Sequence, residues 1–138
     1  MMIIVSACLA GVHCRYDGNA KPCEAVIRLV AEGKAIPVCP EQLGGLTTPR
    51  QSSEIVNGRV WMRDGTDVTG AFTRGAQEAI NLARLAGATS AILKARSPSC
   101  GVGRVYDGTF TGRLIPGDGI FAALCRENGL SVKTEEDL

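Results

Sequence analysis

The chain has 138 residues, enough for one domain with a hydrophobic core and too few for two of ordinary size. Apolar residues make up 45% and aromatic residues only 4%, so the core must be built mainly from Ala, Val, Ile and Leu. The 15 Lys and Arg residues nearly balance the 14 Asp and Glu residues. Net charge therefore gives no reason to expect binding to nucleic acid or to a membrane surface.

The N-terminal residues are not typical of a secretory signal. Their apolar run, MMIIVSACLA, is short, has no basic residue before it and leads directly into turn residues. No segment approaches the ~18 apolar residues that a membrane span needs. We therefore expect a cytoplasmic protein, in which thiols stay reduced. Its six cysteines are then metal-binding, catalytic or buried and do not form a disulfide framework.

Short strands alternate with helices along the first half of the chain. Residues 2–7 form an Ile- and Val-rich run that predicts a strand buried on both faces. The apolar stripe over residues 25–30 predicts a helix that stops before Gly33. Residues 35–39 predict a second strand. Residues 40–53 contain two Gly and two Pro, which indicates a long ordered loop.

The second half begins with a hairpin over residues 54–62, because Asn57-Gly58 at its centre favours a type I′ turn. An Ala-rich helix follows, which Asp67 and Thr69 can cap; it runs to about Ala86 and ends at Gly87. The elements expected after it are a strand over 89–94, a hairpin over 104–114 with its turn at Asp107-Gly108, a helix over 118–128 and a strand over 130–133.

This alternation predicts an α/β fold of the doubly wound, Rossmann-like type. We expect a mostly parallel sheet with helices on both faces and two inserted β-hairpins. No linker or low-complexity segment interrupts the sequence, so residues 1–138 are expected to form a single domain.

Three cysteines share a position that the sequence alone reveals. Cys8, Cys39 and Cys100 each stand at or just after the carboxyl end of a predicted core strand, in IIVSAC, AIPVC and AILKARSPSC. In a parallel sheet these ends lie along one edge, where ligands bind near the topological switch point. We therefore expect the three thiols to converge. Their spacing fits no short metal motif, so buried structural thiols remain the alternative.

The other cysteines and the single histidine fit this site less well. Cys125 lies in a predicted apolar helix face, where core packing explains it. Cys23 lies in the first turn of a helix and is interpreted as a bystander. Cys14 shares a loop with Cys8, and its participation is left open. His13 lies in a Val-His-Cys-Arg loop, which is more typical of a solvent-facing residue than of a Cys–His nucleophilic pair.

Acid–base chemistry then falls to residues beside the cysteines. Glu41 stands two residues after Cys39, and Ser97 and Ser99 precede Cys100. The serines can donate hydrogen bonds to substrate or sulfur, or simply form a turn. Nearby cationic side chains that could offset anionic charge are Arg15, Arg50 and Arg96.

Three sequence blocks together resemble a family of small bacterial proteins that includes thiouracil desulfurase. They are SACLAGVHCRYDG, VCPEQLGGLTTPR and ILKARSPSCGVGRVYDGTFTGRLIPGDG, and the similarity covers essentially the whole chain. The resemblance implies a [4Fe-4S] cluster bound by Cys8, Cys39 and Cys100, with one iron free of protein ligands. It also implies that Glu41 and either Ser97 or Ser99 handle protons.

The activity implied by this resemblance is a non-redox desulfuration. Sulfur leaves a thiocarbonyl compound such as 2-thiouracil as sulfide, and water supplies the oxygen that replaces it. Relatives that act on thiolated tRNA carry an extra domain. We therefore expect a small thiolated nucleobase or thioamide as the substrate, and no nucleic-acid or membrane partner.

Two other classes of function remain open from the residues alone. One is a non-catalytic metal or redox sensor, and the other is a nucleobase-binding module with structural cysteines. A sensor would not need Glu41 or the two serines, so these residues separate it from an enzyme. The sequence does not determine the oligomeric state.

Overall fold

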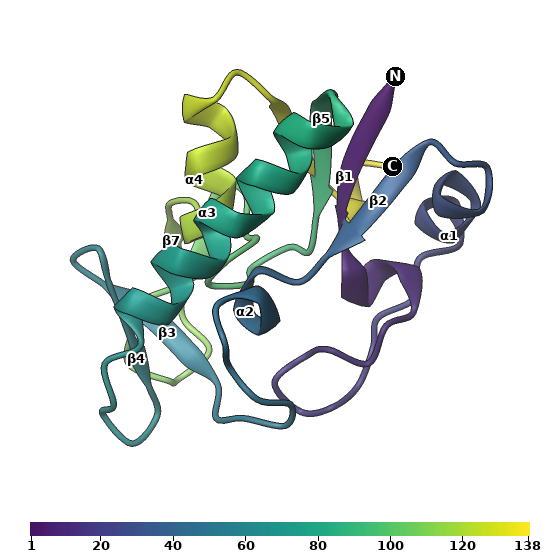
Figure 1. Cartoon of the computed structure of the whole chain (residues 1–138). Coiled ribbons are helices and arrows are strands. Elements are labelled where there is room, and N and C mark those ends of the chain that lie inside the picture. The colour runs from purple at the N-terminus through teal and green to yellow at the C-terminus, as the bar shows by residue number, and fades with distance from the viewer.

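The structure is a computed structural model that describes all 138 residues. Its centre is a four-stranded sheet in which every neighbouring pair is parallel. In spatial order the strands are β2 (Ala35–Val38), β1 (Met2–Ser6), β5 (Ala88–Leu93) and β8 (Ser131–Thr134). The chain thus winds first to one side of β1 and then to the other (Figure 1). This order places the topological switch point between β1 and β5.

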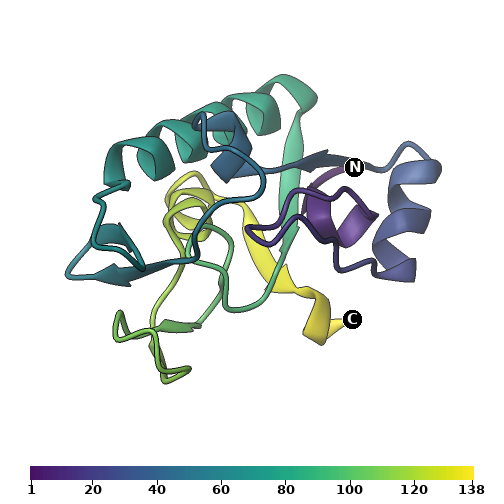
Figure 2. The same ribbon diagram turned by 90° about the horizontal axis from the view of Figure 1, so that it is seen from below.

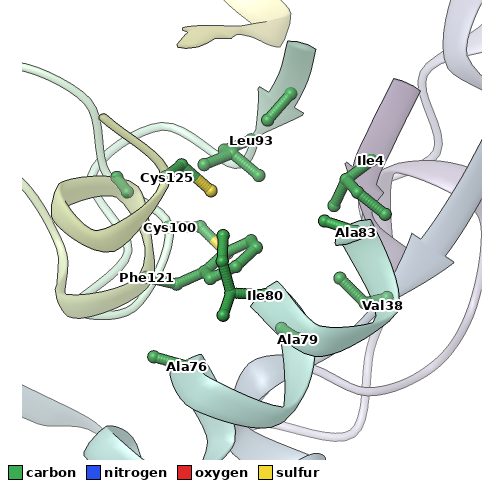
Figure 3. Packing of buried hydrophobic residues seen from close by; sticks show 12 residues of the cluster. Ile4, Val38, Ala76, Ala79, Ile80, Ala83, Leu93, Cys100, Phe121 and Cys125 are labelled. Carbon is green, nitrogen blue, oxygen red and sulfur yellow. The ribbon is translucent and has the colours of Figure 1, made fainter. Parts of the chain in front are cut away.

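Helices cover both faces of the sheet, as predicted. Ile4 of β1 packs on one face with α3 (Thr69–Ala86) and α4 (Ile120–Glu127). The next residue, Val5, points to the other face and packs with α1 (Glu24–Ala31) and the 3-10 helix η1 (Ala7–Ala10). Successive residues of a strand face opposite ways, so an Ile-Ile-Val run supplies both cores. Figure 3 shows the larger core, between the sheet and α3 and α4.

Two antiparallel hairpins lie outside the sheet, on the side away from α1 (Figures 1 and 2). Their strands are β3 (Ser53–Val56) with β4 (Arg59–Met62), and β6 (Arg104–Tyr106) with β7 (Leu114–Pro116). The first has the predicted turn, with positive φ at Asn57 and Gly58. The second has its predicted turn residues, Asp107 and Gly108, at the start of a longer connection. Asp107 accepts hydrogen bonds from Thr109, and the connection over residues 107–113 joins the strands.

The loop predicted over residues 40–53 begins with a one-turn helix, α2 (Pro40–Leu43). This helix packs on α3 at a backbone-to-backbone contact that two glycines permit. A Cβ at Gly75 would overlap the Pro40 carbonyl oxygen, and a Cβ at Gly44 would overlap the Ala71 carbonyl oxygen. The helix α3 therefore fixes the place of α2, which directly follows Cys39.

The chain ends in a short 3-10 helix, η2 (Glu135–Asp137), that follows β8. Its acidic side chains bind the segment after β5. Glu135 accepts a hydrogen bond from the Ala95 N–H and pairs with Lys94, and Glu136 pairs with Arg96. None of the helices has the length and apolar character required to cross a membrane.

Candidate metal centre

The carboxyl ends of the parallel strands bring the predicted cysteines to one pocket. Cys8 lies in η1 directly after β1, Cys39 lies between β2 and α2, and Cys100 lies in the loop after β5. All three line a pocket that encloses about 350 Å³ of empty space, part of it open to solvent. Figure 2 views the molecule from this edge of the sheet. The predicted convergence therefore follows from the strand order, since β1 lies between β2 and β5.

A fourth cysteine, Cys14, lines the same pocket and is only 2% exposed. The Cys39 thiol donates to the Cys14 carbonyl oxygen at 3.8 Å, and the Cys14 thiol is near enough to those of Cys8 and Cys39 to affect its pKa. Sequence analysis left its participation open, and the fold places it beside the other three thiols. Cys23 precedes α1 and lies outside the pocket. Cys125 is buried in the core on α4, close to Cys100 and Phe121 (Figure 3).

Three of the pocket thiols have raised pKa values. Burial raises the pKa of Cys100 to about 12, although hydrogen bonds from Ser6 and Ser99 oppose the shift. A hydrogen bond with Cys14 and burial both raise the pKa of Cys39. For Cys14, the bond with Cys39 lowers the pKa, but the bond with Cys8 and burial raise it to about 11. These thiols are neutral at pH 7 without metal, so metal binding must release protons.

A carboxylate lies in the same pocket and is held from both sides. The Ser99 hydroxyl donates to Glu41 Oε2 at 3.0 Å, and the Arg50 Nε–H donates to Glu41 Oε1 at 3.0 Å. The side chains of Arg50 and Glu41 are only 3% and 14% exposed. This burial strengthens their ion pair beyond that of a typical surface pair. Both carboxylate oxygens therefore have fixed partners.

The two predicted serines have different surroundings. Ser97 Oγ accepts hydrogen bonds from the N–H groups of Ser99 and Cys100, at 3.2 and 3.1 Å. It therefore caps the turn that carries Cys100. Ser99 is 2% exposed, and its hydroxyl lies between Glu41 Oε2 and Cys100 Sγ, 3.7 Å from the sulfur. The two hydroxyl oxygens are 3.1 Å apart.

Sequence reasoning missed one pocket residue, Ser6, at the end of β1. Its hydroxyl oxygen accepts a hydrogen bond from the Lys94 N–H at 2.9 Å, and its hydroxyl group acts to lower the pKa of Cys100. The sequence contained a signal, because Ser6 lies two residues before Cys8 on the predicted strand. Arg50 was expected only to offset charge, and its direct contact with Glu41 was not predicted. Arg96, which was grouped with it, instead pairs with Glu136.

A second and larger cavity adjoins the thiol pocket and encloses about 1080 Å³ of empty space, part of it also open to solvent. The two share lining residues, namely Arg15, Tyr16, Lys94 and Ser97. Five cationic side chains line this cavity, while its one carboxylate, Glu54, accepts hydrogen bonds from the backbone N–H groups of Gly108 and Phe110. The cationic residues are Arg15, Lys21, Arg63, Lys94 and Arg96. Three of them pair with carboxylates outside the lining, Arg15 with Asp17, Lys94 with Glu135 and Arg96 with Glu136, so Lys21 and Arg63 are the lining cations without a carboxylate partner.

The donor set of the thiol pocket fits an iron–sulfur cluster. Cysteine thiolates are the usual protein ligands of such clusters, and hydrogen bonds to their sulfur atoms tune the potential. Here the Ser99 hydroxyl provides such a hydrogen bond to Cys100 at 3.7 Å. No group of three His, Cys, Asp or Glu side chains is arranged to hold a single metal ion. The cysteines that could hold a cluster are the four that line the pocket, Cys8, Cys14, Cys39 and Cys100.

The fold and site define a doubly wound α/β protein with a cysteine-lined centre at its switch point. The chain belongs to the 2-thiouracil desulfurase family, whose sequence model matches residues 3–137. It is similar to a solved structure described as the [4Fe-4S]-dependent thiouracil desulfidase TudS, with 45% identity and a TM-score of 0.95. That similarity covers 99% of this chain and 92% of the other. A Bacillus subtilis relative, described as uncharacterized protein YbbK, is 42% identical over 99% of this chain and 97% of its own length.

Proposed function

We propose that this protein removes sulfur from a small thiocarbonyl compound of the 2-thiouracil type, using an iron–sulfur cluster bound by Cys8, Cys39 and Cys100. One observation carries the proposal. The pocket that gathers these thiols also contains Glu41, hydrogen-bonded by Ser99. A sensor would need the thiols but not this carboxylate–hydroxyl pair. Family membership and the similarity to a [4Fe-4S]-dependent thiouracil desulfidase support the same function.

The proposed reaction exchanges the sulfur of the substrate for the oxygen of water. The carbon–sulfur double bond of the thiocarbonyl breaks, a carbon–oxygen double bond forms, and the sulfur leaves with both protons of the water as hydrogen sulfide. No electrons are gained or lost, so no reductant is needed. When bound, a cluster held by three cysteines supplies one iron without a protein ligand, a thiophilic Lewis acid for the substrate sulfur.

The residues of the chain handle the protons in this scheme. Glu41 Oε1 accepts from the Arg50 cation and Oε2 from the neutral Ser99 hydroxyl, so Oε2 is the more basic oxygen and the one that accepts a proton from the attacking water. Ser99 Oγ lies next to Oε2 and 3.7 Å from Cys100 Sγ, so it can pass a proton toward the sulfur side of the pocket. Ser97 serves this arrangement indirectly by capping the turn.

The test is turnover of 2-thiouracil by anaerobically reconstituted protein in water enriched in oxygen-18, with no reductant present. We expect uracil and sulfide in equal amounts, with the heavy oxygen in uracil. Uracil that lacks oxygen-18 or an absolute need for reductant would refute hydrolysis. A fully loaded protein that forms no uracil would refute the proposed substrate class.

The second cavity favours a larger substrate of the same class, a thiolated nucleobase attached to a ribose phosphate. Its cationic lining suits a phosphate group, and Tyr16, Tyr106 and Phe110 offer aromatic surfaces for a sugar or base. Because the two cavities are adjacent and share four lining residues, a molecule that spans both would place its thiocarbonyl beside the thiols and its phosphate near Lys21 and Arg63.

A further inference from the structure

Arg50 is the most completely bonded side chain near the thiol pocket. Each of its three guanidinium nitrogens has its own partner. Nε donates to Glu41 Oε1 at 3.0 Å, and Nη2 donates to the Cys14 carbonyl at 2.9 Å. Nη1 donates to the Thr47 carbonyl and the Thr48 hydroxyl, both at 3.0 Å. Its side chain is 3% exposed, and a buried cation needs such partners to offset its lost hydration.

These contacts join two loops that end neighbouring strands. Cys14 belongs to the loop after β1, which also contains Cys8, whereas Glu41, Thr47 and Thr48 belong to the segment after β2, which follows Cys39. The backbone of Arg50 strengthens the link, since its N–H donates to the Tyr16 carbonyl at 2.8 Å. The same residue therefore holds both loops in register at the carboxyl edge of the sheet.

We propose that Arg50 is a positioning residue for the reaction, which sets the orientation of the Glu41 carboxylate relative to the thiol pocket. This inference rests on the proposed function. By occupying Oε1, Arg50 leaves Oε2 turned toward Ser99. A carboxylate with only the Ser99 contact could rotate about its terminal torsion, which is broad in glutamate. Arg50 removes that freedom while remaining anchored to the loop of Cys14.

The shape of arginine matters for this role as much as its charge. A planar guanidinium offers donors in fixed directions, and here they serve the carboxylate, the Cys14 carbonyl and the Thr47–Thr48 segment together. Lysine would keep the charge but has a single nitrogen on a flexible stem. Arg50→Lys therefore separates orientation from charge, because a cation remains beside Glu41.

The test is a double-mutant cycle of Arg50→Lys and Glu41→Gln on anaerobically reconstituted protein. Arg50→Lys alone should lower kcat about 10²-fold, the scale of a misplaced catalytic group, with little change in KM and with wild-type iron content. In the Glu41→Gln background it should lower kcat little further, because the group that it positions has already been removed. Arg74→Lys is the matched control, since Arg74 contacts the Gly44 carbonyl of the same segment but not Glu41. It should behave as wild type.

Equal kcat losses for Arg50→Lys in the wild-type and Glu41→Gln backgrounds would overturn the inference, as would a kcat loss that only follows lost iron. If Arg50→Lys folds poorly, Thr48→Ala removes one acceptor of the guanidinium and should lower kcat less, again with full iron. An unchanged kcat in Thr48→Ala would then contradict the inference.

The same double-mutant cycle can be measured on the thermal stability of metal-free protein. It gives the interaction energy between Arg50 and Glu41 and needs no enzymatic activity. An inactive wild-type protein would refute the proposed function. The interaction energy from the stability cycle would still show whether Arg50 and Glu41 interact.

Discussion

Ser97 and Ser99 stand two positions apart but have different hydrogen-bond partners. Ser99 faces Glu41, whereas Ser97 binds two backbone N–H groups of the turn. We predict that Ser99→Ala lowers sulfide release from 2-thiouracil by about 10²-fold or more while iron content stays normal. Ser97→Ala should instead destabilise the protein by about 1 kcal/mol, the usual cost of a lost cap. Turnover, iron assays and thermal melting distinguish the two variants. Lost turnover in Ser97→Ala with only lost stability in Ser99→Ala would assign the catalytic role to Ser97 instead.

The buried thiol of Cys125 is expected to make the stability of the protein depend on pH in the alkaline range. Burial is the main cause that raises the pKa of this thiol from the ordinary 9.0 to about 12. The folded state therefore holds this proton between pH 9 and 12, while the unfolded state loses it. The stabilisation is complete below about pH 9 and falls as pH rises toward 12, by about 1.4 kcal/mol per pH unit. The measurement is urea unfolding of metal-free protein over this range. Cys125→Ala should show a shallower loss of stability, and equal slopes would contradict the assignment.

Some residues of the site could be predicted from the sequence and others could not. The strand-end positions of Cys8, Cys39 and Cys100 were readable because the core strands have clear apolar patterns. The contact between Glu41 and Ser99 joins residues 58 positions apart, and no local pattern reports it. The place of Cys14 depends on the path of an irregular loop, so its sequence context left it undecided.

At the level of elements, the contact between α2 and α3 decides where Glu41 lies. Gly75 allows the helices to touch through their backbones. We predict that Gly75→Ala destabilises the protein by about 1–3 kcal/mol, as overpacking does, and lowers turnover because α2 must move. Gly70→Ala is the matched control on the same helix. An added Cβ there meets nothing within 4 Å, so it should be neutral or stabilise by up to about 1 kcal/mol. Chemical unfolding measures the stability of both variants. An equal loss of stability in Gly75→Ala and Gly70→Ala would refute the close packing of α2 on α3.

The same elements explain which predictions succeeded. The Asn57-Gly58 hairpin and the end of α3 at Gly87 depend on local backbone preferences, and both were confirmed. The helix α2 was missed because a single turn is too short for helical periodicity. In the second hairpin, Asp107-Gly108 marked a turn but did not report the length of the connection over residues 107–113. There Glu54 of the first hairpin binds the Gly108 N–H, a tertiary contact that the local sequence does not encode.

For the whole molecule, net charge proved a poor guide to local charge. The chain has a formal charge of +1, yet five cationic residues line the cavity beside the thiols. If this cavity binds a phosphate, Lys21→Ala should raise KM for a thiouridine 5′-monophosphate about tenfold, the value of one lost charged contact. KM for 2-thiouracil should not change. Lys34→Ala, which removes a cation that pairs with Glu32 outside the cavity, serves as the control. Equal changes for both substrates would exclude a phosphate site here.

The central claim is that three strand-end cysteines bind one iron–sulfur cluster, and anaerobic reconstitution tests it most directly. Iron and acid-labile sulfide should each reach about four per chain in wild type, the content of a [4Fe-4S] cluster. Cys23→Ala should match wild type, because Cys23 lies outside the pocket. Cys14→Ala should also do so, because three ligands suffice. Cys8→Ala, Cys39→Ala and Cys100→Ala should each lose most of the iron while remaining folded by circular dichroism. Wild-type iron and sulfide in any of these three folded variants would contradict the account.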